Sequence, residues 1–184
     1  MSPAAEATKP GGAVSPAAEA TKPGGTGELA RLAVELLTAG GRTVAVAESL
    51  TGGLVTGALT SIAGASVVVR GGVVAYATEL KAVLLGVPAD LLSRRGPVDP
   101  DVAAAMADGV RRLLGATYGL ATTGVAGPGP ADGKPQGTVF VAVAARSETG
   151  CEGLELAGDR QQVRDQAVRW ALSVLVRALR EDAN

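Results

Sequence analysis

A serine between an expected strand and an expected helix is the residue of this sequence best placed for chemistry. Ser49 follows the strand-like run 43–47 and precedes a helix-like stretch from Leu54 to Ile62. A side chain at such a turn projects from the end of a sheet, where ligands of open α/β folds bind, and the helix N-terminus offers N–H groups to an anion. The chain contains no histidine. A lysine, a carboxylate or a tyrosine would therefore have to take the proton of Ser49, and a zinc site would lack its usual ligand.

The residues around Ser49 allow two interpretations. Serine and threonine are ordinary helix caps, so Ser49 and Thr51 could simply begin the next helix. Gly52 and Gly53 favour a functional turn, because each glycine in a first helical turn destabilises the helix by about 1 kcal/mol relative to alanine. A ligand or another strand that approaches the backbone closely would explain them. Glu48 either orients a neighbouring group or is a solvated acid.

Further candidates lie at later junctions. Tyr76 and Lys81 flank a second expected strand-to-helix junction, although by position alone they are more often packing and surface residues. Arg160 and Arg164 fall in the first turns of the last helix, where cations oppose the helix dipole, so at least one should meet an anion or a carboxylate. The Gly- and Pro-rich loop 124–137 matches neither the Walker pattern nor the dinucleotide fingerprint, but long loops of this kind are usually functional or mobile.

The elements that must position these residues alternate between strands and helices. Apolar spacing and capping residues predict helices and strands that form a three-layer α/β/α domain with a mixed, mostly parallel sheet. The last two strands should be antiparallel neighbours, because few residues separate them. The expected helices are 29–37, 54–62, 79–85, 101–114 and one that Asp159 caps; the expected strands are 43–47, 67–69, 73–76 (separated from 67–69 by residues 70–72), 117–123, 138–145 and 153–157.

The first 26 residues differ in composition from the rest. Residues 2–12 recur letter for letter as residues 15–25 and carry no large apolar side chain, so residues 1–26 are expected to form a disordered tail before a domain at 27–184. Neither a signal peptide nor a membrane span is expected. A net charge of −1 and 2% aromatic residues argue against nucleic-acid and membrane partners. The single cysteine, Cys151, excludes an internal disulfide and fits the cytoplasm.

Four segments together resemble a known family. They are residues 47–53 (AESLTGG), 74–81 (VAYATELK) with 85–87, 123–128 (TGVAGP) with 134–139, and 158–160 (GDR) with Val163 and Arg164. In order and spacing they resemble the CinA C-terminal domain family, the competence/damage-inducible protein A family, over nearly all of residues 27–179. Stand-alone members of that family are nicotinamide mononucleotide amidohydrolases.

The resemblance implies an activity and a role for each site residue. The expected reaction converts nicotinamide mononucleotide to nicotinate mononucleotide and ammonia, a step in NAD recycling, with no metal and no cofactor. The implied roles are Ser49 as nucleophile, Lys81 as general base, Tyr76 in a proton relay, Thr123 at the reacting centre, Arg160 as an anchor for substrate or lysine, and Thr51, Gly52, Gly53 and Gly127 around the oxyanion and phosphate. The residues agree with this kind of base: in a chain without histidine, a lysine whose pKa is lowered by burial and by a nearby arginine is a natural acceptor for a serine proton near neutral pH.

Two departures from the family pattern fall near these groups. Leu50 stands where the family often has cysteine, and Ala77-Thr78 stand where it often has Ser-Asn, which could alter the substrate pocket. The family also implies a homo-oligomer that binds a small nucleotide. The alternative function is a nucleotide-binding or protein-interaction module, linked to competence and DNA damage, with little or no turnover; ammonia release from nicotinamide mononucleotide separates the two.

Overall fold

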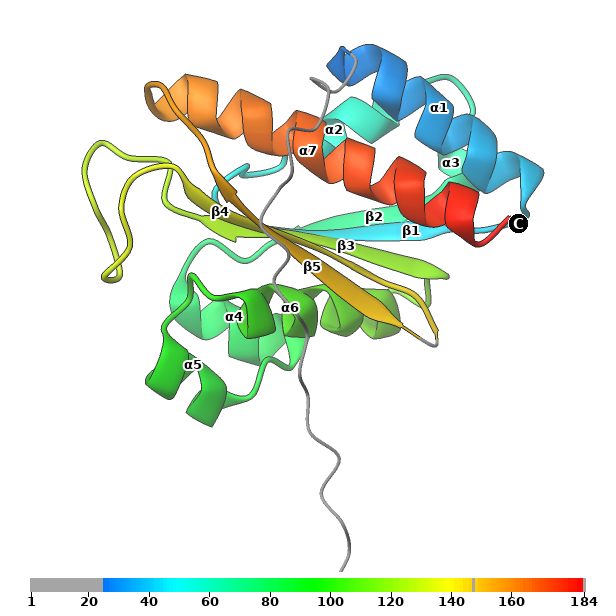
Figure 1. The fold of residues 1–184 in the computed structure, drawn as a ribbon. Helices are drawn as coiled ribbons and strands as arrows, with labels where there is room; N and C mark the ends of the chain where they lie inside the picture. Colours follow the sequence, from blue (N-terminus) through cyan, green and yellow to red (C-terminus); the bar gives the residue numbers. More distant parts are fainter. Residues whose placement is uncertain (1–24, 147, 184) are drawn as a thin grey trace, which may run out of the picture.

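A five-stranded sheet with helices on both faces forms the domain (Figure 1). The structure, a computed structural model, describes residues 25–146 and 148–183, so nearly all of the expected tail lies outside the described residues. The strand order is β2-β1-β3-β4-β5. The three-layer α/β/α architecture is confirmed.

The sheet is parallel on one side and antiparallel on the other. β1 pairs in parallel with both β2 and β3, so the carboxyl ends of these three strands meet at one edge. β3 pairs with β4 in antiparallel orientation, and β4 pairs with β5 in antiparallel orientation as expected from their short connection. The strands are β1 (Val44–Glu48), β2 (Val69–Val74), β3 (Tyr118–Gly124), β4 (Thr138–Ala144) and β5 (Thr149–Glu155).

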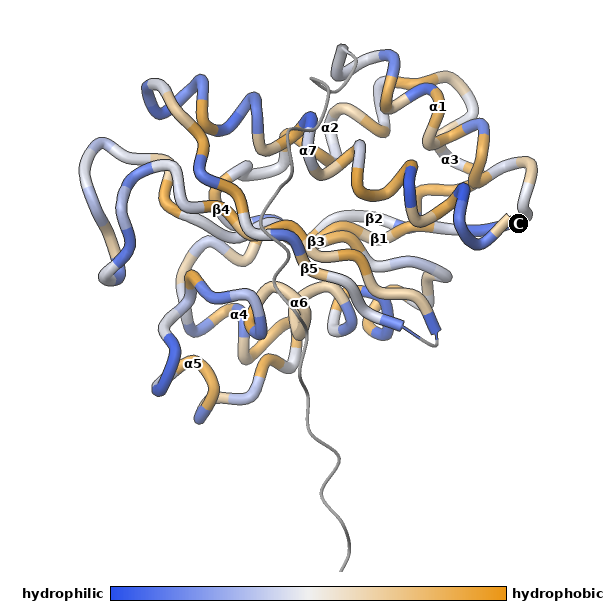
Figure 2. The backbone as a smooth tube through the Cα atoms, viewed as in Figure 1, coloured by the Kyte–Doolittle hydropathy of each residue, from blue (hydrophilic) through white to orange (hydrophobic). Residues whose placement is uncertain are grey.

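The helices form two layers, and Figure 2 shows hydrophobic residues concentrated on the strands and on the helix sides that face them. One layer contains α1 (Thr26–Ala39), α2 (Leu54–Thr60), α3 (Ala65–Val68) and α7 (Arg160–Glu181); the other contains α4 (Thr78–Leu85), α5 (Ala89–Arg95) and α6 (Pro100–Leu113). Asp99 caps α6, and Asp159 and Gln162 form a capping box on α7, which confirms both expected helix starts.

The alternation of side chains along β1 decides which groups reach each layer. Val44 and Val46 pack in the core under α1 and α7, whereas Ala45 and Ala47 pack in the core over α6. Side chains alternate between the two faces of a strand. Glu48 therefore points to the same face as Val44 and Val46, and Ser49 points to the same face as Ala45 and Ala47. The end of β1 thus directs a carboxylate into one layer and a hydroxyl into the other.

The second strand differs from its prediction. β2 runs continuously through Gly71 and Gly72, whereas residues 65–68 form the helical turn α3. A Cβ at Gly72 would lie 2.1 Å from Oγ1 of Thr56, so this glycine lets α2 pack directly on the strand. Gly72 serves packing, whereas Gly71 has a φ of +149° and lies beside an irregularity in the β1–β2 register; parallel pairing with β1 overrides the weak strand propensity of both glycines. Helix α5 was not predicted, and β5 begins four residues before its predicted start at residue 153.

Candidate active site

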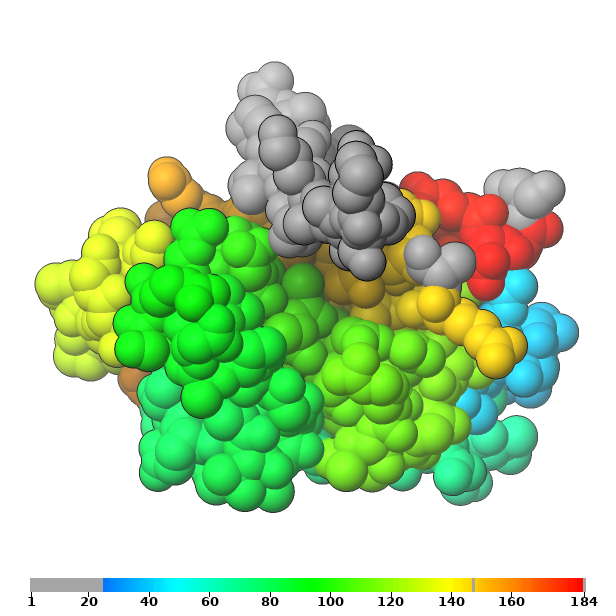
Figure 3. All heavy atoms as spheres, turned by 90° about the horizontal axis from the view of Figure 1, so that it is seen from below, coloured from blue at the N-terminus to red at the C-terminus, as the bar shows by residue number. Residues whose placement is uncertain are grey.

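Six of the nine predicted site residues line one cavity of about 220 Å³ at the carboxyl ends of the parallel strands. Loop 124–137 closes one side of it; in Figure 3 this loop (yellow) lies beside the region of α4 and α5 (green). The six residues are Ser49, Tyr76, Lys81, Thr123, Gly127 and Arg160.

Ser49 and Lys81 are in direct contact at the floor of this cavity. Nζ of Lys81 lies 3.0 Å from Oγ of Ser49 and 3.0 Å from the carbonyl oxygen of Ala75, and the lysine is only 1% exposed. Burial lowers the pKa of Lys81 below its ordinary value of 10.5, and the negative charges of Asp132 and Glu79 only partly oppose this effect. No carboxylate among the described residues forms an ion pair with Lys81. A buried amine with a lowered pKa is suited to accept a proton from the serine beside it.

The backbone fixes this contact from both sides. The N–H of Ser49 donates to the carbonyl of Thr122 at 3.0 Å, and the N–H of Ala75 donates to the carbonyl of Glu48 at 2.9 Å. These bonds extend the β1–β3 and β1–β2 ladders by one residue beyond the strand ends. The carbonyl of Ala75 then accepts from Lys81, so the sheet itself holds the lysine and the serine together.

Arg160 joins two walls of the cavity. Its guanidinium donates to the carbonyl oxygen of Gly127 at 2.6 Å and to the hydroxyl of Tyr76 at 2.8 Å. Tyr76 is 59% exposed and bonds to Arg160, whereas the described contacts of Lys81 and Ser49 do not include it. The geometry therefore places Tyr76 and Arg160 at the rim of the cavity.

Thr123 lies on the same face of the sheet as Ser49. Its hydroxyl donates to the carbonyl oxygen of Pro97 at 2.7 Å, and the residue is 1% exposed. The donor proton is used internally, but a hydroxyl oxygen retains acceptor capacity toward a group in the cavity.

The structure does not support the binding roles expected of Thr51, Gly52 and Gly53. The hydroxyl of Thr51 is buried against that of Thr122 at 2.7 Å, the N–H of Gly52 donates to the Ser49 carbonyl at 3.1 Å, and the N–H of Gly53 donates to the Glu48 carboxylate at 3.0 Å. Gly52 and Gly53 have φ angles of +60° and +97°, in the left-handed region that favours glycine. The turn itself requires these glycines, and their N–H groups are already used.

Glu48 orients its neighbours and is not a solvated acid. The residue is 0% exposed, and its carboxylate accepts hydrogen bonds at 3.0 Å from the N–H groups of Gly53 and Val55. It also accepts from the N–H of Thr56 at 2.8 Å and from the hydroxyl of Thr56 at 2.7 Å. Glu48 thus satisfies the N-terminal N–H groups of α2 from inside the protein and fixes the turn that carries Ser49.

Two further residues, Gln136 and Arg164, position parts of the site, and the sequence did not predict this role for either. Gln136 accepts from the N–H of Gly129 at 3.0 Å and donates to the carbonyl of Gly158 at 2.8 Å, which ties loop 124–137 to the start of α7. Among the described residues, neither Arg160 nor Arg164 pairs with a carboxylate, so a bound anion at one of them stays a prediction. Arg164 donates to the carbonyl oxygens of Leu50 and Thr51, both at 3.1 Å.

Comparisons with known proteins identify the family of this chain. The family described as CinA C-terminal domain matches residues 26–179. The chain belongs to the CinA family. A CinA-like protein of Frankia casuarinae is 53% identical over 144 residues, which is 78% of this chain and 33% of that protein. One from Anaeromyxobacter dehalogenans is 51% identical over 154 residues, 83% of this chain and 38% of that protein. This CinA-family chain thus spans little more than a third of the length of these relatives.

Solved structures of CinA proteins share the fold. The competence/damage inducible protein CihA from Agrobacterium tumefaciens superposes with a TM-score of 0.81 at 39% identity, covering 88% of this chain and 99% of that one. A CinA superfamily protein from Klebsiella pneumoniae gives a TM-score of 0.83 at 34% identity, covering 86% of this chain and 99% of that one. These likenesses support the mixed sheet and its two helical layers.

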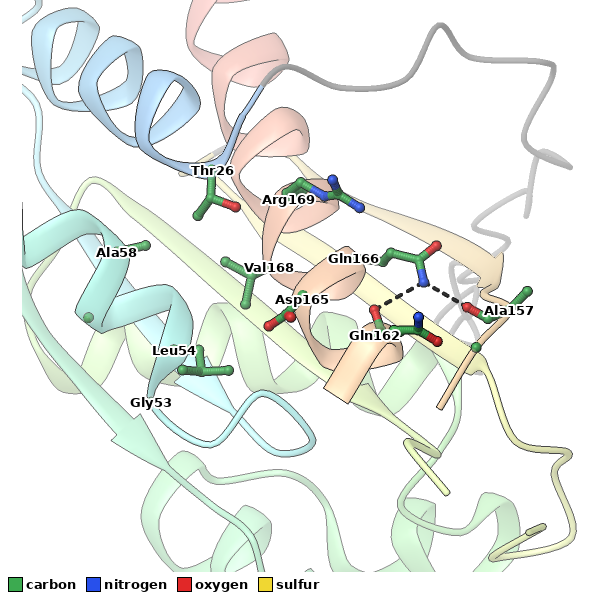
Figure 4. Close-up of a pocket in the computed structure, with 12 residues that line it drawn as sticks. Thr26, Gly53, Leu54, Ala58, Ala157, Gln162, Asp165, Gln166, Val168 and Arg169 are labelled. Carbon is green, nitrogen blue, oxygen red and sulfur yellow. Dashed lines mark hydrogen bonds between the residues drawn. The ribbon is translucent and has the colours of Figure 1, made fainter. Parts of the chain in front are cut away.

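A larger hollow of about 830 Å³ lies elsewhere in this CinA domain, between α2 and α7 (Figure 4). Gly53 lines it, together with Leu54 and the polar side chains of Gln162 and Gln166; among the described residues, the one hydroxyl side chain in its lining, that of Thr26, forms no hydrogen bond with a base. Across residues 25–146 and 148–183, no group of three or more histidine, cysteine or acidic residues is arranged to hold a metal ion. In the same part of the chain, no helix combines the length and hydrophobicity of a transmembrane segment.

Proposed function

We propose that this CinA domain is an amidohydrolase that converts nicotinamide mononucleotide to nicotinate mononucleotide and ammonia. The observation that carries the proposal is the 3.0 Å contact between Oγ of Ser49 and the buried amine of Lys81. A serine beside a base is the arrangement that nucleophilic catalysis requires, and burial brings the lysine toward the neutral form that can act as that base.

The proposed reaction runs in two halves. Neutral Lys81 takes the proton of Ser49, and Oγ attacks the carboxamide carbon to give a tetrahedral oxyanion. The C–N bond then breaks, the protonated lysine returns its proton to the leaving nitrogen, and ammonia departs from an acyl-serine ester. Water attacks this ester with Lys81 again as base. As the C–O bond to Ser49 breaks, the protonated lysine returns its proton to Oγ, and the nicotinate nucleotide is released.

The charges in the cavity support a nucleotide substrate. Arg160 is a cation at the rim, where a phosphate can reach it while the carboxamide lies near Ser49. Asp132 also lines the cavity and offers a carboxylate to a cationic pyridinium ring or to ribose hydroxyls. The volume of about 220 Å³ favours a small substrate such as a mononucleotide over a dinucleotide.

The test is ammonia release from nicotinamide mononucleotide by the wild type and by Ser49→Ala, Lys81→Ala and the double variant. Because the two groups act in one step, all three variants should fall to a similar residual rate, with losses that do not multiply. Ser49→Ala should still bind substrate in calorimetry, and a chelator should leave the wild-type rate unchanged. Ser61→Ala is the matched control, because its hydroxyl is exposed and bonds only to the carbonyl of Ala58.

Two results would contradict the proposal. More than a few per cent of activity in either single variant, or chelator inhibition that zinc reverses, would exclude the serine–lysine mechanism. A wild type that binds nicotinamide mononucleotide without releasing ammonia would favour the alternative, a binding module without turnover.

A further inference from the structure

Asp132 supplies a carboxylate to the cavity that holds Ser49 and Lys81. Among the residues that the structure describes, it is the one acid in the lining of this cavity. Within the same part of the chain, its side chain forms no ion pair and no hydrogen bond with another residue. An acid without a basic partner on an open surface is simply solvated, but in the wall of a small-molecule cavity it is also available to a cationic ligand.

The charge of Asp132 acts on the reacting centre. Burial lowers the pKa of Lys81, and the negative charge of Asp132 opposes this effect more strongly than that of Glu79 does. Glu79 lies two residues from Lys81 on α4 but does not line the cavity, whereas Asp132 belongs to a distant segment, loop 124–137. The cavity lining and the effect on Lys81 thus agree that this charge lies within reach of a ligand at Ser49.

A tight turn fixes Asp132 in the loop. The N–H groups of Ala131 and Lys134 donate to each other's carbonyl oxygens at 3.1 and 2.9 Å. Between them, Asp132 and Gly133 have φ angles of +52° and +71°, as in a type I′ turn. Asp-Gly and Asn-Gly are both favoured in such a turn. The turn therefore explains an aspartate or an asparagine at this position, but it does not explain the negative charge.

We propose that Asp132 is a specificity-determining residue that selects a cationic, N-substituted pyridinium ring over a neutral ring of the same shape. The proposal rests on the proposed function, because it places the substrate carboxamide at Ser49. It deepens that function by choosing the ring, and not the ribose hydroxyls, as the group that the carboxylate recognises. The carboxamide is bonded directly to the ring, so a field that reaches Lys81 also reaches the ring.

The ring charge then affects the base as well. The positive charge of a ring bound beside Asp132 opposes the field that raises the pKa of Lys81, so binding of a cationic substrate lowers that pKa. A neutral ring leaves the field of Asp132 unopposed. The substrates that Asp132 selects are therefore also those that bring Lys81 closer to its neutral form.

The first test measures binding to Ser49→Ala, which keeps the cavity but cannot turn over substrate. The probes are nicotinamide mononucleotide and its benzamide C-nucleotide analogue, in which a neutral benzene ring replaces the pyridinium. Calorimetry should show a preference for the pyridinium nucleotide that weakens as salt is added. Adding Asp132→Asn, which keeps the turn and removes the charge, should reduce this preference by roughly fivefold, the upper value for an exposed charge pair.

Glu79→Gln is the matched control, because it removes a charge that acts on Lys81 from outside the cavity. Added to Ser49→Ala, it should leave the ring preference unchanged. The second test follows ammonia release from nicotinamide mononucleotide against pH. Asp132→Asn and Glu79→Gln should each move the rising limb of kcat/KM to lower pH, because each removes a charge that raises the pKa of Lys81. In the wild type the limb of kcat, which reports the complex, should lie at lower pH than that of kcat/KM.

The outcomes separate the inference from the proposed function. A ring preference that survives Asp132→Asn, equal weakening of both nucleotides, or an unmoved limb of kcat/KM in this variant would overturn the inference, while ammonia release by the wild type would leave the function intact. A ring preference that depends on Asp132 in a protein that releases no ammonia would support the inference and overturn the amidase activity. Failure to bind either nucleotide would overturn both.

Discussion

Glu48→Gln tests whether one buried carboxylate organises the turn of the candidate active site. In the wild type, one carboxylate oxygen accepts from the N–H groups of Gly53 and Val55, and the other accepts from the N–H and hydroxyl of Thr56. A glutamine side chain has one oxygen, so it can accept hydrogen bonds from only one of these two pairs of donors. If the oxygen stays on Gly53 and Val55, the Thr56 hydroxyl can turn and accept from the new amide, but the Thr56 N–H then faces a donor.

The magnitude follows from this count. The N–H of Thr56 loses a hydrogen bond to a charged acceptor, which is worth about 1.5–3 kcal/mol. The N–H groups of Gly53 and Val55 keep an acceptor, but that acceptor is now a neutral oxygen. The N-terminus of α2 also loses a favourable negative charge, worth about 1 kcal/mol or more in a buried setting. The free energy of unfolding should therefore fall by about 3–5 kcal/mol, and the melting temperature by about 10 °C for a domain of this size.

Urea denaturation of Glu48→Gln and Glu28→Gln is the assay. Glu28 is also a glutamate in the first turn of a helix, but it is exposed, so its substitution should change stability by no more than about 0.5 kcal/mol. Ammonia release should fall in Glu48→Gln even at temperatures where the variant is fully folded, because the Ser49 turn loosens. If the free energy of unfolding of Glu48→Gln fell by less than about 1 kcal/mol, or by no more than that of the control, the role given to Glu48 would be refuted.

Two further predictions concern titratable groups. Burial lowers the pKa of Lys81 in the folded state, so just below pH 10.5 the unfolded chain binds more protons than the folded one. The free energy of unfolding of the wild type, relative to that of Lys81→Met, should therefore rise as the pH increases toward 10.5. A difference between the two proteins in urea denaturation that does not change with pH would contradict a lowered lysine pKa. Burial, assisted by the charges of Asp101, Glu152 and Asp99, raises the pKa of Cys151 to about 12, so iodoacetamide at pH 8 should alkylate it far more slowly in the folded protein than in urea, and equal rates would show that the thiol is not protected.

The local features of the site could be predicted from the sequence because they depend on neighbours in the chain. The strand before Ser49, the turn after it and the helix that carries Lys81 are set by short-range patterns, and the structure contains all three. Composition alone restricts the base to a few residue types, because the chain has no histidine.

The remaining features depend on contacts between distant segments, which local patterns do not encode. A helix start alone suggests an anion beside an arginine there, but no local pattern indicates that Arg164 donates to two carbonyl groups more than a hundred residues earlier in the chain. Gly71 and Gly72 suggest a break in the strand, because nothing local reveals that Thr56 will pack against Gly72. Glu48 was ambiguous for the same reason, since its burial depends on where α2 lies.

The contact between Ser49 and Lys81, on which the proposed reaction depends, is set by the register of β1 in the sheet. Glu48 lies opposite Thr122 on β3 and Val74 on β2, and this register sends the carboxylate to α2 and the next side chain to Lys81. A slip of one residue would exchange the two faces, burying the serine against α2 and the carboxylate against the lysine. An ion pair between Glu48 and Lys81 would then keep the lysine protonated and remove its capacity as a base. The parallel pairing on both sides of β1 thus maintains the fold and the proposed base at the same time.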